Sequence, residues 1–590
     1  MITIKINKYL VGCLVGCAVC AVTGCSDYDD YNDVPVDAQL SGNMTLWENI
    51  LQNTQLSDFA GLVKRTGFDA ELSNSRAYTV WAPLNGTYNV ADYQALDDST
   101  LLQQFIKGHV AQYSHVASGL VSERIHMLND KSFMFEGNGS YTFGDVDISK
   151  ANVPSTNGTM HLLDGAAPFY YNIYEYVMAN KQDTLLRDFF KKYELTYLDT
   201  HNSVKGPVVN GMQTYIDSVL VTSNSLLNTI SARLTNEDST YTFLLPNDKA
   251  YQDLYDKVKP TFNYVSTIQV YDVDAFTSYS STNTKELTLS PDYYSDSLTS
   301  RVLVRNLAFS NNNEYNKWIV GNGERTDTMR STNRVKFSNP DEILSHTVQK
   351  VPMSNGYTHI VDSLAFYPWE HYLPQLDISM RYAVTDNSRK RFNFATRFTS
   401  VSDPLGKVLG PEYTDFNYYW IYPTSDYLKP EVFVELPNTM SATYDFYCVF
   451  LPAKVMDYTT EGDSLLLSTD ERPNILNFQL SYPGTNGKVA TYNFSKKYLD
   501  SGASSDANPR TLNMNTAFVN DPLKTDTVYI GEFTLPVSCG GLGEYCPVMH
   551  ISCPVSVFNK VQMATYTRDM RIYQIIMKPK ELVEFEEKQK

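Results

Sequence analysis

The sequence predicts an α+β chain in which two tandem copies of one mixed domain are followed by an all-β sandwich. The pattern N-G-x-x-H-x-x-D at residues 157–164 is repeated at 355–362, and an internal repeat of this kind indicates a duplicated domain. Apolar residues follow helical spacing ahead of each copy, whereas strand-like alternation dominates after about residue 370. We therefore expect domains over 41–172 and 173–370, a β-sandwich over 371–580, and a charged tail that frays over 581–590.

Length, charge and cysteine content exclude several classes of protein. A chain of 590 residues is too long for one hydrophobic core. Its net charge of −18 argues against nucleic-acid binding, which needs a surface rich in Lys and Arg. The cysteines after the first 25 residues are too sparse for a disulfide framework and match no zinc-site spacing. We expect no metal and no cofactor, and either buried free thiols or one disulfide among Cys448, Cys539, Cys546 and Cys553.

The first 24 residues are predicted to be an export signal. Lys5 and Lys8 precede an apolar run that is short for a membrane span. The end of this run, A-V-T-G-C at residues 21–25, resembles the lipobox of bacterial lipoproteins. That resemblance implies cleavage before Cys25 and acylation of this cysteine. An ordinary secretory signal that happens to contain a cysteine is the alternative.

The next residues, 25–40, are predicted to be an acidic tether. Their start resembles the signal that sends Bacteroidetes lipoproteins to the outer face of the outer membrane; a solvated linker is the alternative. We expect a protein that is lipid-anchored in the outer membrane and faces the cell exterior. The residues that carry this resemblance are Ser26, Asp27, Asp29 and Asp30.

The first domain is predicted to begin with a capped helix. Leu46 and Ile50 lie on one helical face. Thr45 stands at the N-cap position, with Glu48 three residues on as in a capping box. Gly67 ends the helical pattern. Beyond it, the pattern predicts a strand at 78–85, a helix at 101–110, strands at 133–148 joined by a turn at 138–139, and a strand after the turn at 157–158.

These elements and motifs resemble the fasciclin (FAS1) domain family. Its members carry a T-x-F-A-P-x-N box, a central helix that ends near a histidine, and a closing N-G-x-x-H-x-x-D. The second copy departs from the first at Asn306, which stands where the first has a histidine. The resemblance implies two FAS1 domains, and the short integrin-binding motifs of the family are not recognisable here. The matching residues are Thr79, Pro83, Asn85, His109, Asn157, Gly158, His161 and Asp164 in the first copy, and Thr242, Pro246, Asn247, Asn355, Gly356, His359 and Asp362 in the second.

The motif histidines, His161 and His359, are each followed by an aspartate three residues on, which suggests a general base. A structural role is the favoured interpretation, because a part-buried imidazole needs partners for both nitrogens and a nearby turn can supply them. The second copy is also longer between its boxes. We expect its extra length to form loops at 278–296 and 310–334. These loops either bind a partner or have accumulated sequence changes that surface loops tolerate.

The last segment is predicted to be a jelly-roll-like β-sandwich. Two of its stretches, 441–450 and 570–576, resemble jelly-roll modules that bind carbohydrate. Tyr418, Trp420 and Tyr422 share one face of a strand. Core packing is one interpretation of this aromatic row, and a platform for a sugar ring is the other. Further strands are expected at 431–436, 444–451, 525–535 and 571–577, with a bulge or a turn at Gly531.

No catalytic, phosphate-binding or dinucleotide motif is recognisable in the sequence. We therefore predict that the protein is not an enzyme, but a surface lipoprotein that acts in adhesion or captures a glycan, or that docks on a protein partner. That partner is expected to be an outer-membrane transporter or surface protein of a starch-utilisation-type uptake complex, and not nucleic acid. The alternatives are a glycan-active enzyme with its site in the β-sandwich and a structural cell-adhesion stalk.

Overall fold

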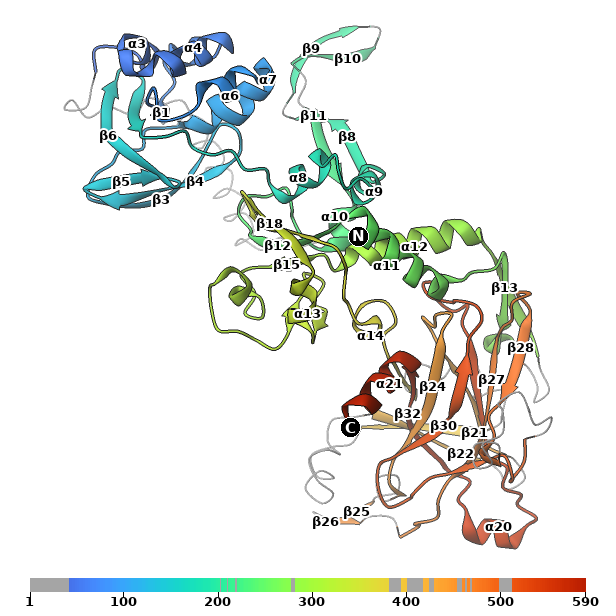
Figure 1. The fold of residues 1–590 in the computed structure, drawn as a ribbon. Coiled ribbons are helices and arrows are strands. Elements are labelled where there is room, and N and C mark those ends of the chain that lie inside the picture. The colour runs from blue at the N-terminus through green and yellow to red at the C-terminus, as the bar shows by residue number, and fades with distance from the viewer. Residues whose placement is uncertain are drawn as a thin grey trace, which may run out of the picture. The chain divides into compact units, whose positions relative to one another are not determined.

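A computed structural model describes residues 42–201, 203–209, 211–217, 220–276, 282–380, 394–400, 417–423, 429–453, 459–461, 464–466, 469–497 and 512–590 (Figure 1). The predicted export signal, Cys25 and the acidic residues Ser26, Asp27, Asp29 and Asp30 lie outside these residues. The chain divides into two units: one comprises Met1–Ala179, Arg233–Tyr241 and Val351–Thr358, and the other the remaining residues. Among the described helices, none is both long and apolar enough to cross a membrane.

The first helices form as their local sequence predicts. At the start of α3 (Leu46–Gln52), the Thr45 hydroxyl accepts a hydrogen bond from the Glu48 N–H, and the Glu48 carboxylate accepts one from the Thr45 N–H at 2.8 Å. The predicted capping box is therefore confirmed. After α4 (Ser57–Arg65), Gly67 takes a φ of +72°, a conformation that glycine adopts without strain. The short segments η1 (Thr54–Leu56) and α5 (Asp69–Leu72) complete this group.

A seven-stranded sheet follows, in the order β2-β1-β7-β6-β5-β4-β3. Its strand β1 pairs antiparallel with β2 and parallel with β7, so both edges of β1 are used. Side chains alternate between two cores: Val80 lies in the core under the helices, and Trp81 lies in the core on the opposite face. The strands are β1 (Tyr78–Pro83), β2 (Val110–Gln112), β3 (Leu120–His126), β4 (Ser132–Asn138), β5 (Ser140–Phe143), β6 (Val146–Ser155) and β7 (Gly158–Leu163).

The predicted helix at 101–110 is present as a π-helical turn followed by a 3-10 turn. These are η2 (Leu101–Ile106) and η3 (Lys107–His109). Two short helices, α6 (Val90–Gln94) and α7 (Asp98–Thr100), precede them. Leu101, Phe105 and Ile106 are buried and pack this segment against the core that lies between the helices and the sheet.

The next part of the chain repeats the scheme with a smaller sheet, in the order β15-β12-β19-β18. Two ribbons that the sequence did not predict, β8 with β11 and β9 with β10, branch off before it (Figure 1). The elements are α8 (Ile173–Ala179), α9 (Leu185–Lys191), β8 (Glu194–Leu198), β9 (Val204–Val209), β10 (Met212–Asp217), β11 (Leu220–Asn224), α10 (Leu226–Ile230), β12 (Tyr241–Pro246), α11 (Asp248–Val258), η4 (Lys259–Phe262), β15 (Ala308–Ser310), β18 (Thr347–Met353) and β19 (Gly356–Val361).

The predicted loop at 278–296 is wrong where the structure describes it. Strand β14 (Thr284–Thr288) pairs with β13 (Thr267–Tyr271), and helix α12 (Pro291–Arg305) follows. Proline suits the first turn of a helix, and this helix buries only a narrow stripe that includes Thr299, Leu303 and Val304. Its polar outer face therefore reads as a loop in the sequence.

The predicted loop at 310–334 holds only η6 (Lys317–Val320) and β16 (Met329–Arg330), so it is largely confirmed. Strand β16 pairs with β17 (Lys336–Phe337). The short elements η5 (Val273–Ala275), α13 (Pro340–Ser345) and α14 (Pro368–His371) complete this region.

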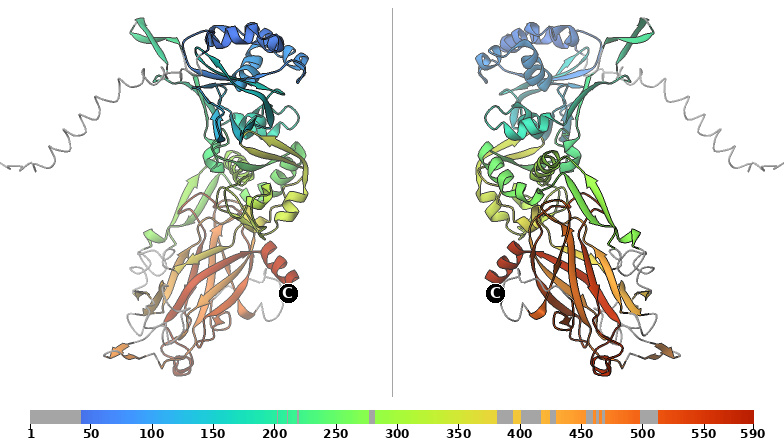
Figure 2. Two further views of the ribbon diagram at one scale, coloured as in Figure 1. Left: turned by 90° about the vertical axis from the view of Figure 1, so that its left-hand side faces the viewer. Right: turned by 90° about the vertical axis from the view of Figure 1, so that its right-hand side faces the viewer.

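Two sheets make up most of the last segment; their strands are drawn in orange to red in Figure 2. One has the order β21-β22-β32-β24-β30, with β20 also on β32, and the other has the order β23-β31-β27-β28, with β29 on β27. Aromatic rings of the two sheets contact each other: the ring centroids of Tyr482 in β27 and Phe533 in β30 lie 4.8 Å apart. The strands are β20 (Leu376–Ser379), β21 (Phe394–Ser400), β22 (Asn417–Pro423), β23 (Glu431–Glu435), β24 (Thr443–Phe450), β27 (Ile475–Pro483), β28 (Val489–Asn493), β29 (Phe518–Val519), β30 (Asp526–Thr534), β31 (Val548–Ser552) and β32 (Met570–Pro579), with a separate hairpin of β25 (Thr459–Glu461) and β26 (Ser464–Leu466).

The strands predicted at 431–436, 444–451, 525–535 and 571–577 are confirmed by β23, β24, β30 and β32. The predicted bulge at Gly531 is confirmed as well, because the pairing of β24 with β30 shifts register there and Gly531 has a φ of +145°. Four cysteines of this segment, Cys448, Cys539, Cys546 and Cys553, are free and buried, as one of the two alternatives predicts.

The expectation that residues 581–590 fray is wrong, because they form helix α21 (Lys580–Gln589). The ring of Phe585 contacts Tyr367 and Trp369, at centroid distances of 5.1 and 4.9 Å. Val583 is buried, and Lys578 pairs with Glu586 at 2.9 Å. Apolar contacts on one face therefore hold a helix that is otherwise charged. A further short helix, α20 (Lys560–Thr565), precedes β32.

Candidate functional site

The motif asparagine of the first copy ties the closing strand to the opening helix. The Asn157 side-chain oxygen accepts a hydrogen bond from the N–H of Leu46, the first residue of α3, at 2.8 Å. Its amide group donates to the carbonyls of Leu72 and Asn74, at 2.9 and 2.7 Å. Because Asn157 is 6% exposed, these bonds satisfy a buried polar side chain as well as a helix end.

Asn355 makes the same set of contacts in the second copy. Its side-chain oxygen accepts from the N–H of Ile173, the first residue of α8, at 2.9 Å. Its amide group donates to the carbonyls of Leu234 and Asn236, at 2.8 and 3.2 Å. The two motif copies therefore share a hydrogen-bond arrangement as well as a sequence.

The first-copy histidines are buried and engaged with the main chain. His109 Nδ1 donates to the Phe105 carbonyl at 2.8 Å, and its Nε2 accepts from the Ala167 N–H at 3.0 Å. His161 Nε2 donates to the His115 carbonyl at 2.9 Å, and its ring stacks on Trp81 with a centroid distance of 5.5 Å. Burial lowers the pKa of both imidazoles to about 4, so both are neutral at neutral pH.

His359 of the second copy is also buried, and burial lowers its pKa to about 4. Its Nδ1 lies 3.1 Å from the Thr347 hydroxyl, and its Nε2 has no hydrogen-bond partner among the described residues. Asn306, where the first copy has His109, donates to Nδ1 of the buried His371 at 3.1 Å. The second copy thus also has a buried imidazole at this position, but from α14.

The remaining motif residues end strands and cap helices. Thr79 donates to the Tyr113 carbonyl, and Thr242 donates to the side chain of Asn311, both at 2.8 Å. Pro83 and Pro246 are the last residues of β1 and β12. The side-chain oxygens of Asn85 and Asn247 accept from the N–H groups of Asp58 and Ala250, in the first turns of α4 and α11. Asp164 is exposed, and Asp362 lies 2.9 Å from His346.

A buried cation lies beside the second motif turn. The Lys131 ammonium is 2.6 Å from Glu175 and 2.9 Å from Glu237, and the Lys131 and Glu237 side chains are only 5% and 8% exposed. The hydroxyl of Ser354, the residue before Asn355, also donates to Glu237 at 2.9 Å. One ammonium therefore serves two carboxylates, and the buried Glu237 depends on Lys131 for its opposite charge.

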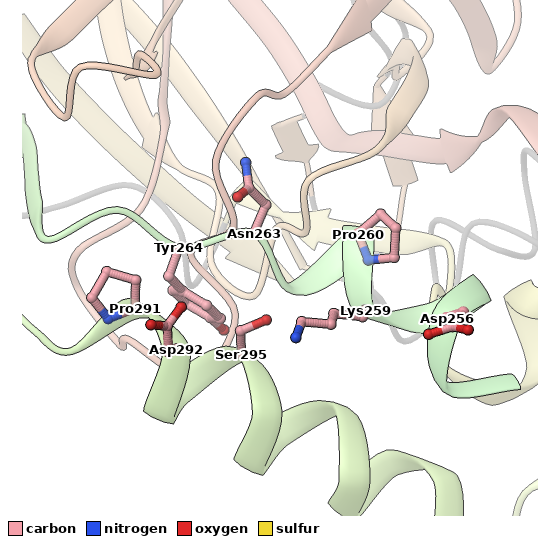
Figure 3. A pocket seen from close by; sticks show the side chains of 8 residues that line it. All are labelled: Asp256, Lys259, Pro260, Asn263, Tyr264, Pro291, Asp292 and Ser295. Carbon is pink, nitrogen blue, oxygen red and sulfur yellow. The ribbon is translucent and has the colours of Figure 1, made fainter. Parts of the chain in front are cut away.

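A pocket lies between η4 and the start of α12 (Figure 3). Its volume is about 460 Å³. Ser295 and Lys259 point toward one another from its two walls, and Pro260 and Pro291 add apolar surface. It is lined by Asp256, Lys259, Pro260, Asn263, Tyr264, Pro291, Asp292 and Ser295.

The pocket wall is fixed by hydrogen bonds to a distant loop. The Tyr264 hydroxyl donates to the Gly540 carbonyl at 2.7 Å, and the Asn263 amide donates to the Pro536 carbonyl at 2.8 Å. The Ser538 N–H donates back to the Asn263 carbonyl at 2.8 Å. These bonds hold the two side chains in place without a ligand.

Residues 54–166 match the family described as the Fasciclin domain. This segment is a fasciclin domain. The chain also matches a solved structure of a FAS1 domain pair from the insect cell adhesion molecule Fasciclin I, at 13% identity over 54% of this chain and 99% of that chain. The TM-score is 0.20. No curated protein matches the chain.

The aromatic row lies on β22, far along the chain from the fasciclin domain. In this strand Tyr419 pairs with Ile572 of β32, and Ile421 is fully buried. Tyr422 is half-buried, and the side chains of Tyr418 and Trp420 lie outside the described part of the structure. The sequence did not predict the pocket of Figure 3 at all. The one local signal was the Ser290-Pro291 pair, which is typical of a helix start.

Proposed function

We propose that this chain is a surface-exposed outer-membrane lipoprotein that binds a ligand or partner without catalysing a reaction. The observation that carries the binding role is the fasciclin domain at residues 54–166, because such domains are associated with adhesion and binding. The motif histidines of the first copy, His109 and His161, support the absence of catalysis. A neutral, buried imidazole whose nitrogens face the main chain is not available as a general base.

We also propose that residues 173–370 form a second fasciclin domain. The support is the contact set of Asn355, which repeats that of Asn157 down to the first residue of the opening helix. Residues 371–580 are proposed to form a β-sandwich. The two sheets of this segment and the ring contacts between them, such as that of Phe446 and Phe494 at 5.2 Å, support this interpretation.

The proposed anchor is a lipid on Cys25, followed by the acidic export signal. Metabolic labelling with a fatty-acid analogue should mark the wild-type protein and not Cys25→Ala. Protease added to intact cells should remove the labelled protein. Labelling that survives in Cys25→Ala, or full protection from protease, would contradict the anchored, outward-facing location.

The proposed ligand is a glycan or an outer-membrane transporter. The full-length chain, purified in detergent, should bind members of a polysaccharide panel or retain a transporter from solubilised outer membranes. If neither binding event is observed, the proposal is wrong. Release of oligosaccharides from any polysaccharide by the purified chain would instead establish the enzymatic alternative.

A further inference from the structure

We propose that the pocket between η4 and the start of α12 binds a neutral saccharide unit. This inference rests on the proposed binding function and names the ligand class and its site. It is independent of the aromatic row on β22, which belongs to another part of the chain.

The first support is the set of polar atoms that the fold leaves open in the pocket. Ser295 is 9% exposed, and its hydroxyl has no hydrogen-bond partner among the described residues although it lines the pocket. Asp292 likewise has no partner in the described part of the chain. Asp256 accepts one hydrogen bond, from Gln252 at 2.9 Å, which leaves its second oxygen open. The Ser295 hydroxyl and the two carboxylates therefore open to the pocket, where a ligand can form hydrogen bonds with them in place of water.

The second support is the charge of the side chains that line the pocket. Two carboxylates, Asp256 and Asp292, line the pocket, whereas the single ammonium, Lys259, is already paired with Asp296 at 2.9 Å. The open atoms are mostly acceptors. A phosphate, a sulfate or a uronic acid would therefore meet repulsion and few donors. A ligand with many hydroxyl groups offers the donors that the pocket lacks.

The third support is shape and rigidity. A pocket of about 460 Å³ lies within the range of small-molecule sites. Pro260, Pro291 and Tyr264 supply apolar surface beside the polar atoms, which matches a sugar ring with its apolar faces and polar rim. Because Tyr264 and Asn263 are held by the Gly540 and Pro536 carbonyls, this wall of the pocket is already ordered before a ligand binds.

The test is a calorimetric titration of the full-length chain in detergent. The probes are neutral gluco- and manno-oligosaccharides, an oligogalacturonate as the acidic counterpart, and spermidine as the cationic one. We expect a neutral oligosaccharide to bind, with the acidic one at least about tenfold weaker. Preference for the oligogalacturonate or for spermidine would overturn the ligand class.

Variants then locate the site. Asp292→Asn preserves size and removes the charge, and Ser295→Ala removes the hydroxyl; each should weaken binding about tenfold. Glu286→Gln, an exposed carboxylate on β14, is the matched control and should bind as the wild type does. Thermal unfolding of each variant separates lost binding from lost fold.

The outcomes separate this inference from the function on which it rests. Oligosaccharide binding that survives both pocket variants overturns the pocket, and loss in Trp420→Ala would move the site to the aromatic row. Absence of glycan binding with capture of a transporter overturns the saccharide site but keeps the binding function. Absence of both overturns the two together.

Discussion

The main-chain oxygen of Tyr78 occupies the space where a Cβ on Gly158 would lie, at 1.8 Å. The second copy has the same close approach, because a Cβ on Gly356 would lie 1.9 Å from the Tyr241 oxygen. Both glycines also have a positive φ, of +145° and +132°. The motif glycine is therefore required by the close passage of two strands.

Gly158→Ala should destabilise the fasciclin domain by about 3 kcal/mol or more, because the backbone must move and the positive φ is strained. Hydrogen exchange of the β1 and β7 amides in the full chain measures the change. Gly61→Ala is the control: Gly61 lies inside α4, and no atom beyond its own helix backbone and chain neighbours lies within 4 Å of the position that a Cβ would take, so alanine should be neutral or stabilising. Equal effects of the two substitutions would contradict the steric explanation.

Lys131→Met should cost about 3–5 kcal/mol of stability, because it leaves Glu237 buried without its cation. Urea unfolding followed by hydrogen exchange near β4 and α8 measures the loss. Adding Glu237→Gln should recover part of it. Lys249→Met is the matched control, since the Lys249–Asp253 pair is exposed, and it should have no measurable effect. A neutral outcome for Lys131→Met would show that the cluster contributes little.

Acid should destabilise the fasciclin domain through its buried histidines. Below the ordinary imidazole pKa of 6.5 the unfolded chain takes up protons, whereas folded His109 and His161 resist protonation until about pH 4. Stability is therefore full above pH 6.5 and falls as the pH drops from 6.5 to 4, by up to about 3 kcal/mol per histidine.

Hydrogen exchange of β7 across this pH range measures the slope. His109→Asn should lower stability at pH 7 and flatten the slope, whereas His126→Gln, at a side chain that is 66% exposed, should leave it unchanged. A stability that is constant between pH 7 and 4 would show that these histidines do not control it.

Phe585→Ala should loosen helix α21 and cost about 1–3 kcal/mol, because the ring loses its contacts with Tyr367 and Trp369. Limited proteolysis of the C-terminus and thermal unfolding measure the effect. Phe558→Ala is the control, because Phe558 is 81% exposed, and it should change neither. Rapid cleavage of the wild-type tail would contradict the packed helix.

The helix ends of the first domain were predictable because interactions between residues close in sequence determine them. The Thr45–Glu48 capping box and the Gly67 stop each depend on residues within a few positions of one another. The repeated motif supplied the rest, since two copies of one pattern identify a domain where one copy is weak. The predicted resemblance is confirmed for residues 54–166.

Long-range packing explains what the sequence did not predict. Phe585 is held by Tyr367 and Trp369, which lie far back in the chain, so the local sequence shows only a charged tail. Helix α12 is polar on most of its surface because only a narrow stripe of it is buried, so its sequence shows little apolar periodicity. The pocket of Figure 3 joins residues 256–264 with 291–295, and no spacing rule connects these two segments.

The place of β1 in its sheet has a consequence for synthesis of the chain. Its parallel partner β7 is the last strand of the fasciclin domain to leave the ribosome. Until then one edge of β1 has no partner, and its buried side chains lack the packing that β7 provides. Folding of this domain is therefore expected to wait for the closing motif, and a chain truncated before residue 158 should remain open to aggregation and proteolysis.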